Sequence, residues 1–284
     1  MIANILDGIV LGLQFGLLAA GLTLMYGLGG VLNLGYGQIA VTSAMAIAIA
    51  MDAGIPILPA VALGLLAGGL FGLILDLTLL RPVYRLHGEA RVLLSLLLTL
   101  GVSFIVDGFL NWRIPLKALT LYIGGAVQIL GVPMRRGSLV ASAITLVAFA
   151  GLFIFFGRTS LGRAIRSVIE DEEGARLIGI DPKKMLRLIL VLSGVMAGLV
   201  AVTRSMVAPV DTQSGLSITV FALIVTVVGG LGNVAGALLA GIILGIINVI
   251  AADYIGSYIS LIILLAAAAA TILIRPAGLL GVKE

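Results

Sequence analysis

Residues 157–187, GRTSLGRAIRSVIEDEEGARLIGIDPKKMLR, decide the fold because they are densely charged in a chain that is otherwise strongly apolar. They include seven basic and five acidic residues, and one charge at the centre of a bilayer costs about 2.5–3.5 kcal/mol even on the mildest scale. The segment must therefore lie in water. Helical spacing of its apolar residues predicts one or two short amphipathic helices at the membrane surface; a solvated connecting loop is the alternative. The apolar positions are Ile165, Val168, Ile169, Ala175, Leu177 and Ile178.

The composition of the whole chain predicts an all-α, polytopic transmembrane helical bundle. Hydrophobic residues make up 61% of the sequence and charged residues 11%, against about 25% charged in a soluble domain, and the mean hydropathy is +1.26. The apolar runs are long and do not alternate as the strands of a membrane barrel would. The 38 glycines suit helices that pack closely, and the absence of cysteine excludes disulfides and thiol chemistry.

Nine apolar segments are expected to cross the membrane, or eight if the first region is re-entrant. The whole chain, residues 1–284, forms a single domain in this interpretation. Within the segment 92–110, Ser95, Thr99, Ser103 and Asp107 lie about one turn apart and are expected to share one face. The expected crossings are residues 5–28, 38–51, 58–80, 92–110, 139–156, 188–208, 218–228, 234–250 and 258–274.

The distribution of basic residues orients these crossings. Residues 81–91, 158–187 and the tail from Arg275 contain most of the arginines and lysines, so the positive-inside rule places all three in the cytoplasm. The long loop with Arg135 and Arg136 then faces outward, where the rule is weaker. The N-terminus is external if residues 5–28 form one full crossing.

Two glycine-rich breaks interrupt the apolar pattern, namely residues 27–37 (GLGGVLNLGYG) and 227–233 (VVGGLGN). Irregular backbone at membrane depth is tolerated only where it packs on protein or lines a water-filled path. The polar residues in and beside the breaks are therefore candidates for a translocation path or its gate. The alternative is that the glycines only allow close helix packing. The candidates are Asn33, Tyr36, Gln38 and Asn233.

Motifs for chemistry are missing from the sequence. It contains no GxxxxGK[ST] loop, HExxH, GxSxG or Cys/His cluster, so neither ATP binding, metal binding nor enzymatic activity is expected. The lone His87 falls in a charged loop, and Arg204 either pairs with Asp211 or extends to the membrane surface. Transport without an internal energy source fits best. The carboxylates within the spans all fall near predicted span ends: Asp7, Asp76, Asp107, Asp211 and Asp253.

Several motifs in order resemble the permease of branched-chain amino-acid ABC transporters. Residues 173–179, EGARLIG, resemble the EAAxxxG signature of ABC importer permeases, with glycine for the first alanine. Residues 158–202 resemble a longer run of that family. The run starts with R-T-x-x-G-x-A-x-R-A and continues with an acidic pair, the motif A-x-x-x-G-I and a span rich in small residues. Residues 21–37, 228–245 and 275–281 resemble its two glycine-rich blocks and its closing R-P-x-G-L-F-G. The likeness covers almost the whole chain and is greater to the H-type (LivH-like) subunit.

The sequence departs from the family pattern at two places. Thr219-Val220-Phe221 stands where the family often has Lys-Ala-Phe, and Gly35-Tyr36-Gly37 stands where it usually has Ala-His-Gly. Both lie beside the expected path, so they bear on the substrate and leave the architecture unchanged.

The resemblance implies a transmembrane permease subunit of a prokaryotic ABC importer in the cell (inner) membrane. Its implied partners are a second permease subunit, two cytoplasmic ATPase subunits and an extracytoplasmic substrate-binding protein, besides membrane lipid. ATP and magnesium would bind in the ATPases and no cofactor in this chain, and no nucleic acid is expected to bind.

The implied substrate is a branched-chain or related aliphatic amino acid. Urea or short amides are alternatives, and an ATP-independent secondary transporter or channel is the alternative from another class. The resemblance places a cytoplasmic coupling helix within residues 158–187. The residues expected to couple to the ATPase are Glu170, Asp171, Glu173, Gly174, Ala175, Ile178, Gly179 and Ile180.

Overall fold

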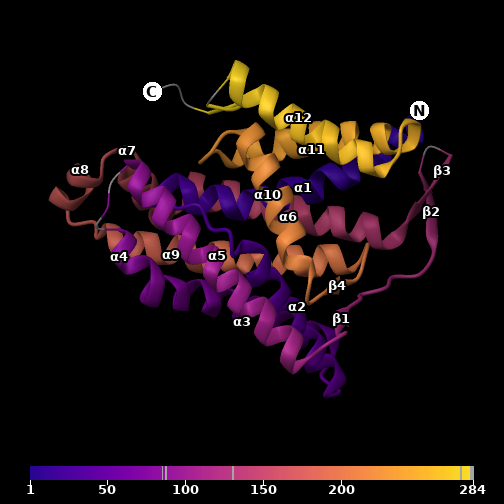
Figure 1. Cartoon of the computed structure of the whole chain (residues 1–284), viewed down its shortest axis with the longest axis horizontal. Coiled ribbons are helices and arrows are strands. Elements are labelled where there is room, and N and C mark those ends of the chain that lie inside the picture. Colours follow the sequence, from indigo (N-terminus) through magenta and orange to yellow (C-terminus); the bar gives the residue numbers. More distant parts are fainter. Residues whose placement is uncertain (85, 87, 130, 276, 282–284) are drawn as a thin grey trace.

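The chain folds into a bundle of long helices that run between two ends of the molecule (Figure 1). The computed structural model describes residues 1–84, 86, 88–129, 131–275 and 277–281. The helices of the bundle are α1 (Ile2–Gly29), α2 (Tyr36–Asp52), α3 (Ile57–Leu75), α5 (Gly88–Arg113), α6 (Arg136–Arg158), α9 (Pro182–Ser205), α10 (Ser214–Gly229), α11 (Val234–Tyr254) and α12 (Ser257–Ile274). Helix α3 continues through the π-helix η1 (Asp76–Leu80) into the single turn α4 (Arg81–Val83).

Each of the nine predicted crossings coincides with one of these helices, which confirms the predicted bundle. Among the described residues, seven helical segments are long and apolar enough to cross a membrane. Helices α2 and α10 are shorter, with 17 and 16 residues. At 1.5 Å per residue they extend about 25 Å, less than the ~30 Å hydrocarbon core. These two helices are the shortest of the nine bundle helices within the described residues.

Contacts at both ends of the bundle fix how its helices alternate in direction. At one end, Asn4 donates a hydrogen bond of 2.8 Å to Asp253, which joins the start of α1 to the end of α11. Lys117 pairs with Asp52 at the same end. At the other end, the backbone N–H of Leu279 donates to the carbonyl of Val228. Because α1 is a single helix, the positive-inside rule then places the N-terminus outside and the C-terminal segment in the cytoplasm.

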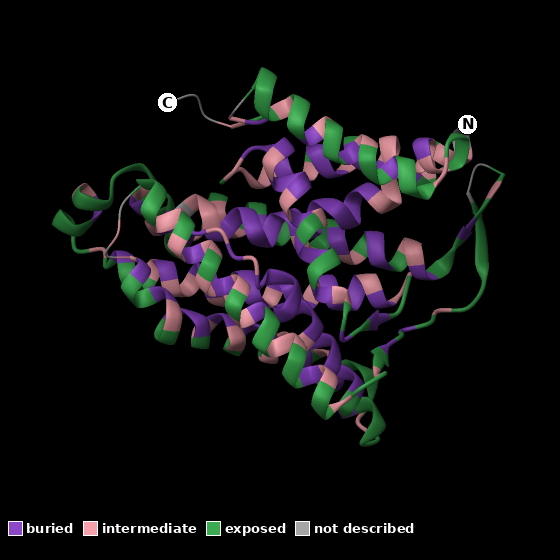
Figure 2. Cartoon of the chain, viewed as in Figure 1, coloured by how far each residue is buried: buried purple, intermediate pink, exposed green. Residues whose placement is uncertain are grey.

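Glycines let the central helices pack backbone against backbone. Helix α1 lies in the interior, where Figure 2 shows most of its middle buried, and its Gly12 faces α11. A Cβ added to Gly12 would lie 2.6 Å from the Cα of Ile242, closer than any side chain permits. Gly68 of α3 and Gly194 of α9 meet in the same way through their backbones. Small residues at helix interfaces provide close packing where lipid supplies no hydrophobic driving force.

Four short strands lie at the external end, on the right of Figure 1. β2 (Ala126–Ile129) pairs antiparallel with β3 (Val132–Arg135), in register Ala126 with Arg135, and β1 (Ala118–Leu119) pairs with β4 (Val210–Asp211). The sequence predicts a hairpin over residues 121–132, and the structure has one a few residues further along.

Candidate functional site

The charged segment contains two helices, α7 (Ser160–Glu170) and α8 (Glu172–Leu177), which protrude from the cytoplasmic end of the bundle (Figure 1). Thr159 caps α7, with its hydroxyl accepting a hydrogen bond of 2.9 Å from the N–H of Gly162. Gly162 sits directly on the end of α6, because an added Cβ would lie 2.7 Å from the Cα of Phe156. Ile165 and Val168 bury the apolar face of α7. The predicted amphipathic helices are therefore present.

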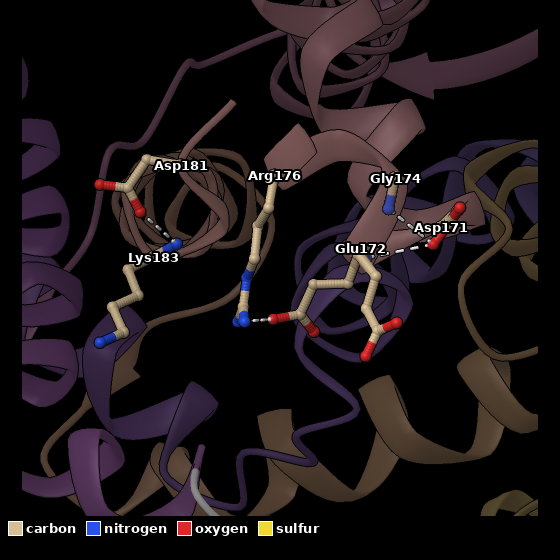
Figure 3. Close-up of polar contacts among 7 residues, drawn as sticks. Asp171, Glu172, Gly174, Arg176, Asp181 and Lys183 are labelled. Carbon is tan, nitrogen blue, oxygen red and sulfur yellow. Dashed lines mark hydrogen bonds and ion pairs between the residues drawn. The ribbon is translucent and has the colours of Figure 1, made fainter. Parts of the chain in front are cut away.

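Asp171 separates the two helices. Its backbone is extended (φ −152°, ψ 101°), which ends α7, and its carboxylate accepts hydrogen bonds from the N–H groups of Glu173 (3.1 Å) and Gly174 (3.0 Å). This is the geometry of a helix N-cap, where a carboxylate also favours the helix dipole. A Cβ on Gly174 would lie 3.0 Å from the Cγ of Asp171. Gly174 therefore lets the capping carboxylate approach closely (Figure 3).

Gly179 ends α8 in a Schellman motif. The N–H of Ile180 donates to the carbonyl of Ala175 (2.9 Å), and that of Gly179 donates to the carbonyl of Arg176 (3.0 Å). Gly179 has φ +85°, a left-handed conformation that costs other residues about 1–2 kcal/mol. Asp181 and Pro182 then begin α9, where the Asp181 carboxylate accepts a hydrogen bond from the N–H of Lys183 at 3.0 Å.

Two large apolar side chains remain in water at the tip of α8. Leu177 is 89% exposed and Ile178 74% exposed, whereas Ala175, which the sequence analysis places on the same surface, is 3% exposed. Ala175 therefore shapes the helix pair from within, and Leu177 and Ile178 form its surface. The ion pair Glu172–Arg176 (2.5 Å) is exposed and contributes little stability. Glu170 and Glu173 are also exposed.

The first glycine-rich break lies inside the bundle, between the end of α1 and the start of α2. Its backbone polar groups are bound by threonines of neighbouring helices. The N–H of Leu34 donates to the hydroxyl of Thr99 (3.0 Å), and the N–H of Gly37 donates to that of Thr219 (2.9 Å). Thr219 is one of the positions at which the sequence departs from the resembled pattern. Asn33 is fully buried, and its side-chain oxygen accepts from the N–H of Gly35 (2.8 Å).

A polar cluster extends from this break toward the external end. The side-chain nitrogen of Gln38 lies 3.4 Å from a carboxylate oxygen of Asp107. Asn111 donates to the same oxygen at 3.2 Å and accepts from Thr212 at 2.8 Å. The Gln38 carbonyl oxygen is buried without a hydrogen-bond partner among the described residues. A carboxylate beside an unused carbonyl oxygen suits an ammonium group. As predicted, Ser95, Thr99 and Ser103 share the buried face of α5 that leads to Asp107.

Tyr36 packs against a neighbouring helix, and Asn233 caps the start of α11. The Tyr36 ring lies against Gly21 of α1, where an added Cβ would lie 2.6 Å from the Tyr36 Cζ. Asn233 caps α11 by accepting from the N–H of Gly236 (2.9 Å), and it donates to the carbonyl of Leu280 (2.7 Å). Gln38 packs on Gly215 at the start of α10, and Asn233 follows the end of α10. The 16 residues of α10 separate them by about 24 Å.

A partly buried ion pair that the sequence analysis does not include lies at the cytoplasmic end. Asp76 is 3% exposed, and one of its oxygens accepts from the Nε of Arg187 (3.2 Å) and the other from the hydroxyl of Tyr84 (3.1 Å). Burial and the Asp76 charge raise the pKa of Tyr84 above its ordinary value, so the hydroxyl stays a donor. The sequence analysis places Asp76 near the end of a span but does not pair it with Arg187.

Other candidate residues are less informative. Arg204 is partly buried and forms no ion pair with Asp211 within the described part of the chain. The described residues contain no cluster of three or more metal-binding side chains. His87 lies outside the described residues.

An interrupted helix bundle with a polar cluster between its helices, and a helix pair exposed at its basic end, are together typical of a multi-pass membrane permease. Residues 4–274 match the family described as "Branched-chain amino acid transport system / permease component", and the chain belongs to this family. The resemblance drawn from the motifs is thereby confirmed, as is the location in the cell inner membrane. The family consists of permease components and not of catalytic subunits.

Three relatives illustrate the similarity. The chain is 26% identical to the high-affinity branched-chain amino acid transport system permease protein BraD of Pseudomonas aeruginosa, over 99% of this chain and 96% of that protein. It is 25% identical to LivH of Salmonella typhimurium, a permease protein of the same description, over 98% and 94%. It is 28% identical to the probable branched-chain amino acid transport permease protein LivH of Methanocaldococcus jannaschii, over 94% and 88%.

Proposed function

We propose that this chain is the membrane-spanning subunit of an ABC importer that moves a branched-chain or related aliphatic amino acid into the cell. The observation that carries the proposal is the α7–α8 pair: Leu177 and Ile178 are exposed at the tip of two well-capped helices on the basic end of a family member. An exposed apolar pair on a rigid support is suited to docking against another protein. A secondary transporter or channel would not need such a surface.

In the proposed mechanism, one of two ATPase subunits binds this surface, and a second permease subunit completes the membrane part. The residues expected to couple to the ATPase fall into two groups, those exposed on α8 and those that shape its backbone. Leu177, Ile178 and the exposed Glu173 contact the ATPase, while Ala175 and Gly179 hold α8 in shape. ATP closes the ATPases and moves α7 and α8, and the bundle alternates between outward and inward states as a population shift. ATP and magnesium belong to the ATPases.

The translocated amino acid passes the polar cluster of Gln38, Asp107, Asn111 and Thr212, which lies beside the short helices α2 and α10. Asp107 and the carbonyl oxygen of Gln38 bind its ammonium group through charge-assisted hydrogen bonds. Asn33 and Tyr36 support the interruption, and Asn233 acts as a cap at the cytoplasmic side. Urea and short amides have no ammonium group, so this cluster favours an amino acid over them.

Purification of the tagged chain from its native membranes tests the assembly. We expect a second permease and ATPase subunits to co-purify, and the complex in proteoliposomes to take up leucine, isoleucine or valine when ATP and an extracytoplasmic binding protein are supplied. Urea and acetamide in the same assay are the matched controls. Uptake without ATPase subunits would assign the chain to the secondary transporters, and preference for urea would contradict the amino-acid substrate.

A further inference from the structure

A cavity of about 330 Å³ lies at the cytoplasmic end of the bundle, between the end of α3 and the start of α9. It is separate from the polar cluster and from the α8 tip. Its lining residues come from η1, α4 with the residue that follows it, and the first turns of α9. They are Asp76, Arg81, Tyr84, Lys183 and Arg187.

The cavity is positively charged. Asp76, the one carboxylate among the described lining residues, is already engaged on both oxygens by Arg187 and Tyr84. Arg81 and Lys183 are exposed and form no ion pair with any carboxylate in the part of the chain that the structure describes. Beside the neutralised Asp76–Arg187 pair, the cations of Arg81 and Lys183 suit an anionic ligand with several acceptor oxygens, such as a phosphate ester.

An apolar surface leads along α3 to this cavity. Its exposed side chains recur every three or four residues and end at Arg81, four residues after Leu77. The acyl chains of a phospholipid can lie along this stripe while its phosphate reaches Arg81. A soluble phosphate has no apolar part that would contact the stripe. The stripe consists of Leu63, Leu66, Leu70, Ile74 and Leu77.

We infer that this cavity binds the phosphate headgroup of an anionic phospholipid from the cytoplasmic leaflet. Arg81, Lys183 and the free guanidinium nitrogens of Arg187 contact the phosphate. Asp76 positions Arg187, and Tyr84 supplies a second fixed polar group at the cavity wall. Basic pockets between helices on the cytoplasmic side are suited to such headgroups. The bound lipid would join α3 to α9, and the inference does not depend on which solute is transported.

Lipid binding to the purified complex tests the inference. Native mass spectrometry in neutral detergent would follow titration with phosphatidylglycerol and, separately, with phosphatidylcholine. Each basic residue near an anionic lipid contributes about 1 kcal/mol, or about fivefold in affinity. We therefore expect Arg81→Gln with Lys183→Gln to weaken phosphatidylglycerol binding about 25-fold. Lys184→Gln is the matched control, because Lys184 is exposed beside the cavity but does not line it.

Four results would overturn the inference. One is equal binding of the two lipids to the unchanged complex, and another is unaltered phosphatidylglycerol binding by the double variant. The third is displacement of the lipid by inorganic phosphate or glycerol phosphate at similar concentration, which would assign the site to a soluble anion. Loss of ATPase subunits from the double variant with the lipid adduct retained would make the cavity a protein-docking site instead. Thermal unfolding in lipid-free detergent verifies that the variants are folded.

Discussion

The Asp76 carboxylate and the Arg187 guanidinium, 111 positions apart in the chain, meet at 3.2 Å where α3 and α9 reach the cytoplasmic end. The same two helices pack through Gly68 and Gly194 further inside the membrane. One close backbone contact and one partly buried ion pair therefore fix a single α3–α9 arrangement. The pair also holds Arg187 at the wall of the cationic cavity.

Removal of Arg187 should destabilise the protein more than removal of both charges. Breaking a buried pair leaves one unpaired charge, at a cost of about 3–5 kcal/mol, and because the Arg187 side chain is 39% exposed we expect about 2 kcal/mol for Arg187→Ala. Asp76→Asn in the same chain should restore more than half of this loss. The measurement is the free energy of unfolding in a denaturing-detergent titration. Arg166→Ala is the control, and strictly additive effects would contradict the coupling of the pair.

The double substitution of Leu177→Ser with Ile178→Ser should weaken attachment of the ATPase subunits. Burial of one such side chain contributes about 1.5–3 kcal/mol, so each loss lowers affinity roughly 10- to 100-fold. Retention of ATPase subunits on the tagged permease is the readout, with uptake measured in parallel. Leu58→Ser is the control, since Leu58 is 80% exposed at the opposite end. If the double variant retains ATPase subunits as well as the unchanged protein does, α8 is not part of the docking surface.

A bulky residue at Ala175 should act by displacing α8. Ala175 is 3% exposed, and inserting extra volume into a packed site costs about 1–3 kcal/mol. Ala175→Trp is therefore expected to uncouple ATP hydrolysis from uptake and to open the α8 backbone to hydrogen exchange. Ala175→Gly, which adds no volume, should keep uptake. Normal exchange protection together with lost ATPase binding would instead place Ala175 directly at the interface.

Asp107→Asn should lower amino-acid uptake while leaving the assembled complex intact. The substitution keeps the shape and removes the charge that binds an ammonium group, and a hydrogen bond to a charged group is worth about 1.5–3 kcal/mol. We expect the substrate concentration for half-maximal uptake to rise about tenfold or more. Asp253→Asn is the control, because Asp253 is exposed near the external end and bonded to Asn4. An unchanged concentration dependence would exclude Asp107 from the path.

Glycines that look alike in sequence should differ in their tolerance of alanine. A Cβ at Gly12 would lie 2.6 Å from the Cα of Ile242, whereas one at Gly101 would meet nothing within 4 Å. Gly12→Ala should therefore destabilise the chain by about 1–3 kcal/mol through overpacking. Gly101→Ala should be neutral, or stabilising by up to about 1 kcal/mol from helix propensity. Unfolding of the purified subunit measures both, and equal effects would contradict the α1–α11 packing.

The sequence by itself determined the membrane class, the nine helical segments and the charged helix pair. Each of these depends on local quantities: the transfer free energy of an apolar run, the cost of charge in lipid and the spacing of apolar residues. The C-terminal end of α8 and the start of α9 also have local causes, since Gly179 and Pro182 act on their own backbone.

Only the tertiary structure decided which distant residues meet. Hydropathy does not specify that Gly12 faces Ile242, that Asp76 binds Arg187, or that Ala175 turns inward while Leu177 and Ile178 remain in water. In lipid, apolar helix faces are nearly equivalent, so close packing and hydrogen bonds select the partners. Gln38 and Asp107, 69 residues apart, come together only because α2 begins inside the bundle beside α5 and α10. They meet because the helical segment breaks before α2. The sequence shows that this break exists, but it does not show where the break lies within the bundle.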